Sequence, residues 1–268
     1  MKTAVITGSA RGFGFEMAKR FRENNFNVVL SDLNEEKLQN AKEELLKINS
    51  DAKVIYVQAD VTNKNELINL WNESKQHFES VDYWINNAGV NQPQKAIFEL
   101  MEKEIDLVLK VDLYGAIYGS QIAFEKMNDQ GFGQIFNIEG YGSNDAMMLG
   151  LNVYGTSKRA VTHFTQALAK ESESLNSKVL VGRLSPGIMI TDFITSANGK
   201  KGEIELSEKT KKVYNILGDY PDVISKFLVN KMIKNTKNNV QFNWLTGFKA
   251  FTRFMGAGFN KRDFFKEN

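Results

Sequence analysis

Residues 2–14 read KTAVITGSARGFG. The first part, Lys2–Thr7, is a short apolar run that predicts a buried strand, and the glycines that follow it predict a tight loop leading into a helix. Glycine lets the backbone turn sharply and approach a pyrophosphate, and the first N–H groups of a helix are donors for phosphate oxygens. The segment therefore predicts a nucleotide-binding strand, loop and helix.

The glycine spacing needs support from elsewhere, because G-x-x-x-G-x-G differs from the common G-x-G-x-x-G pattern and also suits a plain strand-to-helix turn. Asp32 ends the second predicted strand, where a carboxylate accepts hydrogen bonds from the adenosine ribose. Its charge would repel a 2′-phosphate and favours NAD, whereas Arg11 in the loop could bind that phosphate and favours NADP. We predict NAD, with NADP as the alternative. A role for Asp32 as a helix N-cap or turn residue is compatible with ribose binding.

Short apolar runs alternate with helical stretches along most of the chain. Further strands are predicted at 27–31, 53–58, 82–86, 133–138, 178–184 and 239–245, and helices at 15–24, 35–47, 65–78, 105–127 and 154–172. This alternation predicts an α/β fold with a doubly wound parallel sheet of Rossmann type. We expect one dinucleotide-binding and catalytic domain over 1–246, followed by a helical extension over 247–268. In such sheets ligands bind at the carboxyl ends of the strands.

Composition excludes several classes of function. The 268 residues carry a net charge of only +2, which predicts no nucleic-acid partner. The absence of cysteine excludes a thiolate catalyst and fits a reducing cytoplasm, and the two histidines, His77 and His163, stand alone, so no metal site is predicted. No apolar run approaches the roughly 20 residues of a spanning helix, and no signal peptide is expected. We expect a cytoplasmic homodimer or homotetramer that acts on a small molecule.

Tyr154 and Lys158 are four residues apart in YGTSK, on one face of a predicted helix. Free tyrosine, with a pKa of about 10, is a poor base at neutral pH. A neighbouring ammonium and a positive nicotinamide ring favour the phenolate, so the phenol could exchange a proton with a substrate oxygen while the cofactor exchanges a hydride. The spacing alone is common by chance. Behind a nucleotide loop and a fifth strand it predicts an acid/base pair.

Taken in order, these segments resemble the short-chain dehydrogenase/reductase family over roughly residues 1–195. The resemblance implies that Asp60 and Val61 flank the adenine, that Asn87–Gly89 line the cofactor cleft, and that Ile188 and Thr191 contact the carboxamide end, while Lys158 also holds the nicotinamide ribose. The residues expected to bind the cofactor are Gly8, Ser9, Arg11, Gly12, Phe13, Gly14, Asp32, Leu33, Asp60, Val61, Asn87, Ala88, Gly89, Tyr154, Lys158, Pro186, Gly187, Ile188 and Thr191.

Two positions depart from the family pattern. Asp112 stands where the family usually has an asparagine that supports a water-linked proton relay. The change is tolerable if that residue acts through its main-chain carbonyl, whereas the proton relay could differ if the side chain matters. The family serine pair after the fifth strand is replaced by Glu139 and Gly140, so Ser143 is the best hydroxyl to hold the substrate oxygen, with a plain loop serine as the alternative. The expected catalytic set is therefore Tyr154, Lys158, Ser143 and Asp112.

The segment 135–143, IFNIEGYGS, resembles the chlorophyll b reductase branch of the family, as do 82–89 and 214–232. That resemblance suggests a carbonyl on a bulky, apolar ring compound. The main expectation is an oxidoreductase that transfers a hydride between NAD(H) and a hydroxyl or carbonyl of such a substrate. An NADPH-dependent reductase is one alternative. A nucleotide-binding regulator without turnover is the other, because fold does not imply function.

The last part of the chain is basic and aromatic. Residues 226–268 hold nine basic and two acidic side chains, and Phe248, Phe251, Phe254 and Met255 recur at helical spacing. A helix packed on the core or on a partner subunit is the first interpretation. Peripheral contact with a membrane and a cover over an apolar pocket stay open. Residues 191–213 lie where the family has its substrate loop, and we expect a mobile lid there.

Overall fold

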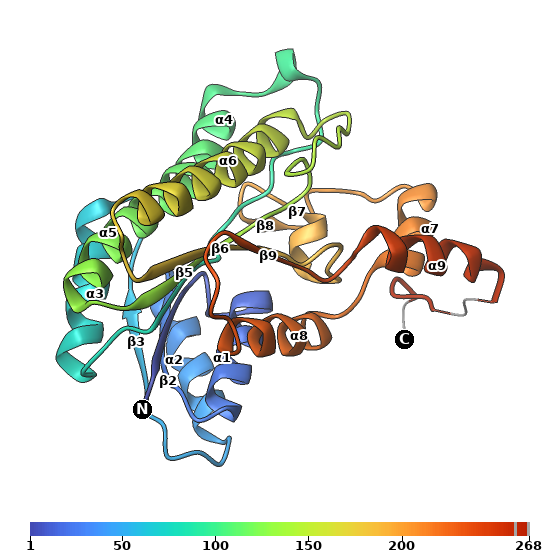
Figure 1. Ribbon diagram of the computed structural model, residues 1–268. Coiled ribbons are helices and arrows are strands. Elements are labelled where there is room, and N and C mark those ends of the chain that lie inside the picture. The colour runs from blue at the N-terminus through green and yellow to red at the C-terminus, as the bar shows by residue number, and fades with distance from the viewer. Residues whose placement is uncertain (260–261, 267–268) are drawn as a thin grey trace.

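The computed structural model describes residues 1–259 and 262–266, with seven parallel strands in one sheet (Figure 1). Their order is β3-β2-β1-β4-β5-β6-β9, so the chain winds outward from β1 in one direction and from β4 in the other. This confirms the predicted doubly wound α/β fold. The strands are β1 (Thr3–Thr7), β2 (Asn27–Asp32), β3 (Val54–Gln58), β4 (Tyr83–Asn86), β5 (Gly133–Ile138), β6 (Val179–Ser185) and β9 (Val240–Asn243).

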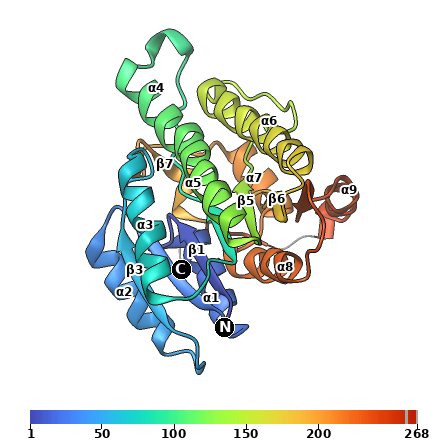
Figure 2. The same cartoon turned by 60° about the vertical axis from the view of Figure 1, so that its left-hand side comes forward.

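Helices cover both faces of the sheet, as Figures 1 and 2 show. On one face lie α1 (Gly12–Glu23), α2 (Glu35–Leu46) and α8 (Pro221–Ile233). On the other lie α3 (Lys64–His77), α5 (Gly115–Gln130) and α6 (Asn152–Ser174), and α4 (Glu102–Val108) extends beyond the sheet (Figure 2). A strand buried between two helical layers is apolar on both sides, which is why β1 reads as an uninterrupted apolar run.

The core is divided between the two faces by the pleat of the strands. Ala4 and Ile6 of β1 pack toward α1 and α8, whereas Val5 between them packs toward α3 and α5. Successive side chains on a strand point to opposite faces, so one five-residue strand contributes to both clusters. The carboxyl ends of the strands are thereby held at one edge, with the switch in winding between β1 and β4.

The long helix predicted over 105–127 is interrupted. A π-helix, Leu109–Tyr114, separates α4 from α5, and Asp112 lies inside it, buried. The apolar periodicity continues through this segment, so the pattern of side chains did not reveal the change in backbone hydrogen bonding. Single π turns within helices occur often at functional sites. The interruption therefore marks Asp112 as a residue whose placement matters.

The segment expected to be a mobile lid, 191–213, contains several short elements of regular structure. It holds a 3₁₀ turn (Asp192–Thr195), a short hairpin of β7 (Ser196–Ala197) and β8 (Lys200–Lys201), and the start of α7 (Glu208–Leu217). The hairpin tip is fastened, because the Asn198 N–H donates to the Asn91 carbonyl at 3.0 Å. The mobility of this segment as a lid stays a prediction. Neither α7 nor α8 was predicted from the sequence.

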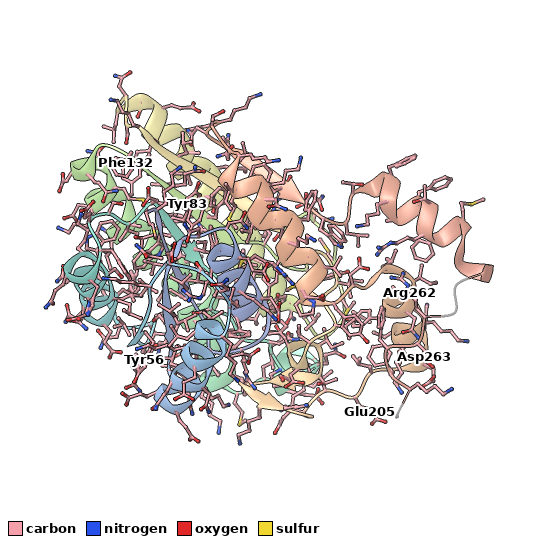
Figure 3. All side chains as sticks on the ribbon, turned by 90° about the horizontal axis from the view of Figure 1, so that it is seen from below. Tyr56, Tyr83, Phe132, Glu205, Arg262 and Asp263 are labelled. Carbon is pink, nitrogen blue, oxygen red and sulfur yellow. The ribbon has the colours of Figure 1, made fainter. Side chains whose placement is uncertain are left out.

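The C-terminal extension carries the predicted amphipathic helix, α9 (Gly247–Met255), followed by a short 3₁₀ turn over 257–259. It packs against α7 at one end of the molecule, and Figure 3 shows Arg262 and Asp263 at the end opposite Tyr56. The aromatic positions of α9 remain exposed rather than buried on the core. Residues 260, 261, 267 and 268 of the predicted extension, among them Lys261 and Glu267, lie outside the described residues.

Candidate functional site

The glycine loop forms an open cradle at the start of α1. Gly8 and Gly12 have φ angles of +63° and +61°, which favour glycine. A Cβ atom on Gly14 would lie 2.3 Å from the Gly8 carbonyl oxygen, whereas a Cβ on Gly12 would meet nothing within 4 Å. Arg11, the N-cap of α1, provides no side-chain acceptor for the first helical amides. The helix N-terminus is thus open to an anion such as a pyrophosphate.

Thr7 and Asn87 fasten this loop to the neighbouring strand end. The Thr7 hydroxyl oxygen accepts from the N–H groups of Asn87 and Ala88, at 3.0 and 3.1 Å. The Asn87 side-chain amide donates to the carbonyls of Thr7 and Gly8, both at 2.9 Å. The Asn87 side chain therefore holds the two strand ends together at the switch in winding, where a ligand is expected in this type of sheet.

Ser9 and Asp32, which are also predicted to bind the cofactor, differ in the exposure of their side chains. Ser9 is fully buried, and its hydroxyl donates to the Ile6 carbonyl at 2.7 Å, so it braces the loop from inside. Asp32 is partly exposed at the end of β2, and its carboxylate accepts from the N–H groups of Leu33 at 2.8 Å and Ala10 at 3.3 Å. The N-cap of α2 is Asn34, not Asp32. The Asp32 carboxylate is consequently available to a ribose.

The Asp60–Val61 pair follows β3 on the same edge. One Asp60 oxygen accepts from the Thr62 N–H at 2.8 Å and shapes a turn. Val61 is buried against α5, since a Cβ on Gly115 would lie 2.8 Å from its Cγ2. The turn places both residues at the carboxyl end of β3 beside Asp32, in agreement with the sequence-based grouping.

Tyr154 and Lys158 are buried on the first turns of α6. Tyr154 is 7% and Lys158 5% exposed, and the Lys158 Nζ lies 5.6 Å from the centre of the Tyr154 ring. The side chain of Gln92, also buried, accepts from the Tyr154 N–H at 2.7 Å and donates to the Gly150 carbonyl at 2.7 Å. Gln92 therefore fixes the start of the helix that carries the pair. Sequence reasoning missed it, because nothing local distinguishes this glutamine from others.

Asp112 binds Lys158 directly. Its Oδ2 lies 2.9 Å from the Lys158 Nζ, and its Oδ1 accepts from the Val90 N–H at 2.7 Å. The Asp112 side chain is wholly buried, and burial raises the pKa of its carboxyl against the opposing effect of Lys158. Gly89 borders the pair, because a Cβ there would lie 3.4 Å from the Asp112 carboxylate. Asp112 thus enters the site through its side chain.

The environment of Tyr154 favours the neutral phenol. Burial raises the pKa of its hydroxyl well above the ordinary value, and the nearby Asp112 and Tyr214 add to that shift. Phe193, from the 3₁₀ turn after β6, places its ring centre 6.1 Å from that of Tyr154. Neither Phe193 nor Tyr214 was singled out from the sequence, because only the folding of 191–217 brings them to the site.

Ser143 lies near the pair but is occupied by backbone groups. Its hydroxyl oxygen accepts from the Gly140 N–H at 3.1 Å, and the hydroxyl donates to the Lys158 carbonyl at 3.3 Å. Gly140 is the residue that faces the phenol, because a Cβ on it would lie 2.4 Å from the Tyr154 oxygen. In the described arrangement the Ser143 hydroxyl stabilises the loop after β5.

Glu139, at the other family serine position, is buried in a separate polar cluster. It accepts from the Thr162 hydroxyl at 3.0 Å and from the Gln241 amide at 2.6 Å, and Arg183 lies 3.6 Å away. These partners come from α6, β9 and β6. Glu139 therefore links α6 to β6 and β9, whereas Asp112 binds Lys158 of α6.

The segment after β6 begins at the same edge of the sheet. Gly187 has a φ of +73° and sits against Leu245. The Ile188 carbonyl accepts from the Asp219 N–H at 3.1 Å, which joins this segment to the turn before α8, and Thr191 precedes the 3₁₀ turn that holds Phe193. Pro186, Gly187, Ile188 and Thr191 are thus brought to the edge that carries Tyr154.

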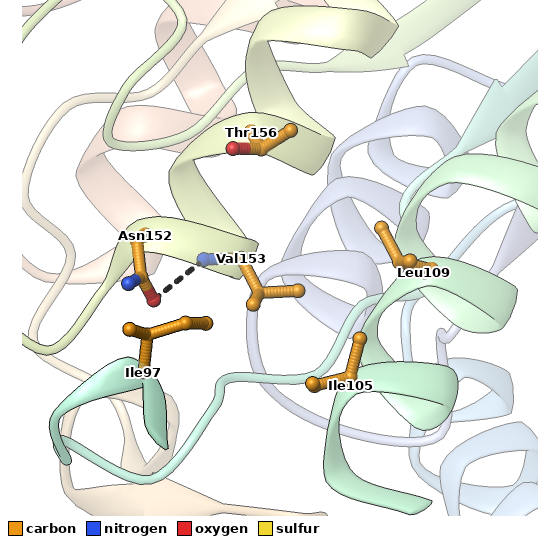
Figure 4. Close-up of a pocket in the computed structure, with 6 residues that line it drawn as sticks. All are labelled: Ile97, Ile105, Leu109, Asn152, Val153 and Thr156. Carbon is orange, nitrogen blue, oxygen red and sulfur yellow. Dashed lines mark hydrogen bonds between the residues drawn. The ribbon is translucent and has the colours of Figure 1, made fainter. Parts of the chain in front are cut away.

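A pocket of 240 Å³ lies between α4 and the first turn of α6 (Figure 4). Figure 4 shows Val153, Ile105 and Leu109 pointing into it, together with Ile97, while Thr156 and Asn152 complete its wall. Neither Tyr154 nor Lys158 lines it, and it holds no titratable side chain. We therefore separate this apolar pocket from the candidate catalytic centre.

No cluster of potential metal ligands and no membrane-spanning helix is found among the described residues. Over residues 1–259 and 262–266, no three His, Asp or Glu side chains come together as a metal site would need, and both histidines are exposed. None of the helices in that part of the chain has the length and apolar character of a membrane span.

Comparison with known proteins gives a family match. The family model described as short chain dehydrogenase matches residues 2–202. The chain is 29% identical to the probable chlorophyll(ide) b reductase NYC1 of Arabidopsis thaliana, over 91% of this chain and 51% of that protein. It is 30% identical to the chlorophyll(ide) b reductase NOL of the same plant, over 93% and 71%. The chain thus spans about half the length of NYC1.

The fold also has solved counterparts. An alcohol dehydrogenase from the archaeon Thermococcus sibiricus, determined with 5-hydroxy-NADP, superimposes with a TM-score of 0.75 at 21% identity, over 92% of this chain and 97% of that one. At this identity the likeness concerns the fold. Together with the family match, it confirms the resemblance that the sequence motifs indicated.

Proposed function

Because the chain belongs to the short-chain dehydrogenase family, we propose that it is an oxidoreductase that transfers a hydride between NAD(H) and a hydroxyl or carbonyl of an apolar, ring-containing small molecule. The observation that carries the proposal is the buried Tyr154–Lys158 pair beside an open glycine cradle. Both lie at the carboxyl edge of one parallel sheet, where a nucleotide and a substrate could meet.

In the proposed reaction the nicotinamide, when bound, supplies or accepts the hydride at the reacting carbon. Tyr154 then exchanges its phenolic proton with the substrate oxygen. Lys158 lies beside the ring and is placed to hold the nicotinamide ribose, while Gln92 keeps the first turn of α6 in position. Burial of the pair excludes water from the proton transfer. The role of Ser143 as holder of the substrate oxygen stays a prediction and would require its backbone hydrogen bonds to rearrange.

The residues present fit a dinucleotide. The open space at Gly12, the uncapped N-terminus of α1 and the partly exposed Asp32 carboxylate match a pyrophosphate and a ribose with a free 2′-hydroxyl. We therefore propose NAD as the preferred cofactor, with Arg11 as the residue that would admit NADP. Asp32→Ser should raise the ratio of kcat/KM for NADPH over NADH about tenfold or more, the effect of roughly 1.4 kcal/mol. An unchanged ratio would count against NAD preference.

The substrate class rests on the names of the relatives and on the surroundings of Tyr154. Phe193 packs on the Tyr154 ring, and the loop that leads into α6 exposes Met147 and Leu149 at 92% and 97%. Large exposed apolar side chains beside a cleft suit an apolar ligand. The chlorophyll(ide) b reductases in the comparison act, by name, on a large ring compound.

The test is a screen of NADH and NADPH consumption with steroid, quinone and sugar carbonyls, in the wild type and in Tyr154→Phe. We expect at least one apolar ring carbonyl to be turned over and Tyr154→Phe to lower kcat by about 100-fold or more. Tyr114→Phe, at an exposed tyrosine of the π-helix, is the matched control and should leave kcat unchanged. NAD binding without any Tyr154-dependent turnover would favour the non-catalytic regulator.

Three further proposals concern the whole molecule. The division into a domain over 1–246 and an extension over 247–268 is supported by the separate position of α9 in Figure 1. A cytoplasmic homodimer or homotetramer stays a proposal, to be tested by light scattering and by cell fractionation. Peripheral membrane contact through α9 is supported by the exposure of Phe248 and Met255 at 78% and 72%, and sedimentation with anionic vesicles tests it.

A further inference from the structure

Asp112 departs from the family asparagine and lies in the buried surroundings of Lys158 and Tyr154. The π-helix Leu109–Tyr114 turns its carboxylate to within 2.9 Å of the Lys158 ammonium, and both side chains are shielded from solvent, at 0% and 7% exposed. The Val90 N–H binds the second carboxylate oxygen at 2.7 Å. An asparagine here would offer an acceptor of the same shape but no charge.

A buried lysine beside a tyrosine normally stabilises the phenolate, because the opposite charges attract strongly where water is absent. Here the ammonium is already paired with a carboxylate, so the pair presents little net charge to the phenol. We propose that Asp112 keeps Tyr154 protonated at neutral pH and so prepares the site to donate a proton to a carbonyl oxygen rather than to take one from an alcohol. This inference rests on the proposed oxidoreductase function.

The groups that face Tyr154 agree with this reading. Lys158 faces it from α6 itself, Asp112 from the π-helix and Tyr214 from α7, while Phe193 and Gly140 add no charge. Lys158 is the cation among them in the described part of the chain, and Asp112 holds it. Burial, Asp112 and Tyr214 all raise the pKa of the Tyr154 hydroxyl.

In the proposed carbonyl reduction, the hydride and the proton that reach the substrate each have a defined source. In carbonyl reduction the carbon receives a hydride, with its two electrons, from the reduced nicotinamide when that cofactor is bound. The carbonyl oxygen receives the Tyr154 proton, so the C=O double bond becomes a C–O single bond while one C–H and one O–H bond form. The phenolate regains its proton from water before the next turnover. In the reverse direction Tyr154 must first lose its proton, which Asp112 opposes.

The experiment titrates Tyr154 without cofactor or substrate. Phenolate absorption near 295 nm is recorded from neutral to alkaline pH, and the spectra of Tyr154→Phe are subtracted to isolate this tyrosine. Asp112→Asn, with its own Tyr154→Phe background subtracted, should lower the midpoint by about one to three pH units, the usual effect of a nearby like charge. At any pH below both midpoints, such a shift makes the fraction of Tyr154 in the phenolate form tenfold or more larger in Asp112→Asn than in the wild type.

Controls keep the result decisive. Asp106→Asn removes the carboxylate of an exposed ion pair, in which Asp106 lies 2.8 Å from Lys110, and should leave the midpoint unchanged. Lys158→Met should raise it. Asp112→Ser serves if Asp112→Asn does not fold, as judged by circular dichroism. A midpoint that is unchanged or higher in the Asp112 variants overturns the inference.

The titration separates this inference from the function on which it rests. If Tyr154→Phe retains full turnover, the proposed function fails whatever the midpoint is. If turnover depends on Tyr154 but the midpoint does not depend on Asp112, the proposed function stands and the inference fails. With an active substrate, the alkaline limb of alcohol oxidation should begin at lower pH in Asp112→Asn than in the wild type.

Discussion

Asp112 and Asp219 each bind basic side chains at nearly the same distance, but in different surroundings. Asp112 meets Lys158 at 2.9 Å, with both side chains buried. Asp219, in the turn before α8, meets Arg253 at 2.8 Å and Arg262 at 3.2 Å, and these arginine side chains are 20% and 35% exposed. Both regions hold an ion pair between a carboxylate and a basic side chain, and they differ in how far that pair is exposed to water.

That difference decides what each carboxylate does. Asp219 also accepts from the Trp244 indole N–H at 2.7 Å, so its charge is surrounded by donors and reaches no reacting group. It fastens the extension, through Arg253 and Arg262, to the turn before α8, whose backbone pairs with Ile190. Asp112 has one cation and one backbone donor, and its field acts on Tyr154. An ion pair near the surface is structural, whereas a buried one can set a protonation state.

The largest expected effect comes from breaking the buried pair. Lys158→Met leaves the Asp112 carboxylate buried without its cation, which should lower the free energy of unfolding by about 3–5 kcal/mol. Urea unfolding followed by circular dichroism measures this loss. Adding Asp112→Asn to Lys158→Met should recover most of it. A loss no greater than that of Lys110→Met, in an exposed pair, would contradict the contrast between the two regions.

A smaller effect is expected at the other carboxylate. Asp219→Asn weakens its hydrogen bonds to Arg253, Arg262 and Trp244 and should cost about 1.5–3 kcal/mol of unfolding free energy. It should also expose the segment after Gly247 to proteases, which limited trypsin digestion measures. Asp106→Asn is the matched control and should change stability by less than about 1 kcal/mol.

Salt provides an independent check of the same contrast. Charges near the surface are screened over about 8–10 Å at moderate ionic strength, and buried pairs much less. The cost of Asp219→Asn should therefore shrink as NaCl is raised, while the cost of Lys158→Met should not. If salt changed the stability costs of Asp219→Asn and Lys158→Met equally, burial would not distinguish the two ion pairs.

The smallest expected effect is on the pH dependence of stability, and it comes from Lys249, which lies near Asp219. Partial burial, together with Arg253, lowers the pKa of its ammonium from 10.5 to about 8. The folded state then binds fewer protons than the unfolded state between these values, so stability rises as the pH increases from 8 to 10.5. Because Lys249 is partly exposed, we expect the wild type to gain less than about 1 kcal/mol over Lys249→Met. Urea unfolding midpoints of both proteins at pH 7.5 and 9.5 measure this difference in stability. A larger stability of the wild type relative to Lys249→Met at pH 7.5 than at pH 9.5 would contradict the prediction.

Much of the fold could be predicted because its signals are local. The strand and glycine loop at 3–14, the strand β5 and the helix that carries Tyr154 follow from apolar runs, glycines and spacing between near neighbours. The π-helix at 109–114 and the hairpin at 196–201 could not, because an apolar pattern does not distinguish an α-helix from a π turn, and a short exposed hairpin needs its partner surface. The helices α7 and α8 were not predicted from the sequence.

The parallel α/β sheet, the nucleotide cradle and the Tyr154–Lys158 spacing follow from residues that are close together along the chain. The surroundings of these features depend on contacts between distant segments. Asp112 meets Lys158 although 45 residues separate them along the chain, Gln92 reaches Tyr154 from the segment after β4, and the Ser143 hydroxyl binds backbone groups. Burial and partners decide the effect of a charge, and both exist only once distant segments pack together.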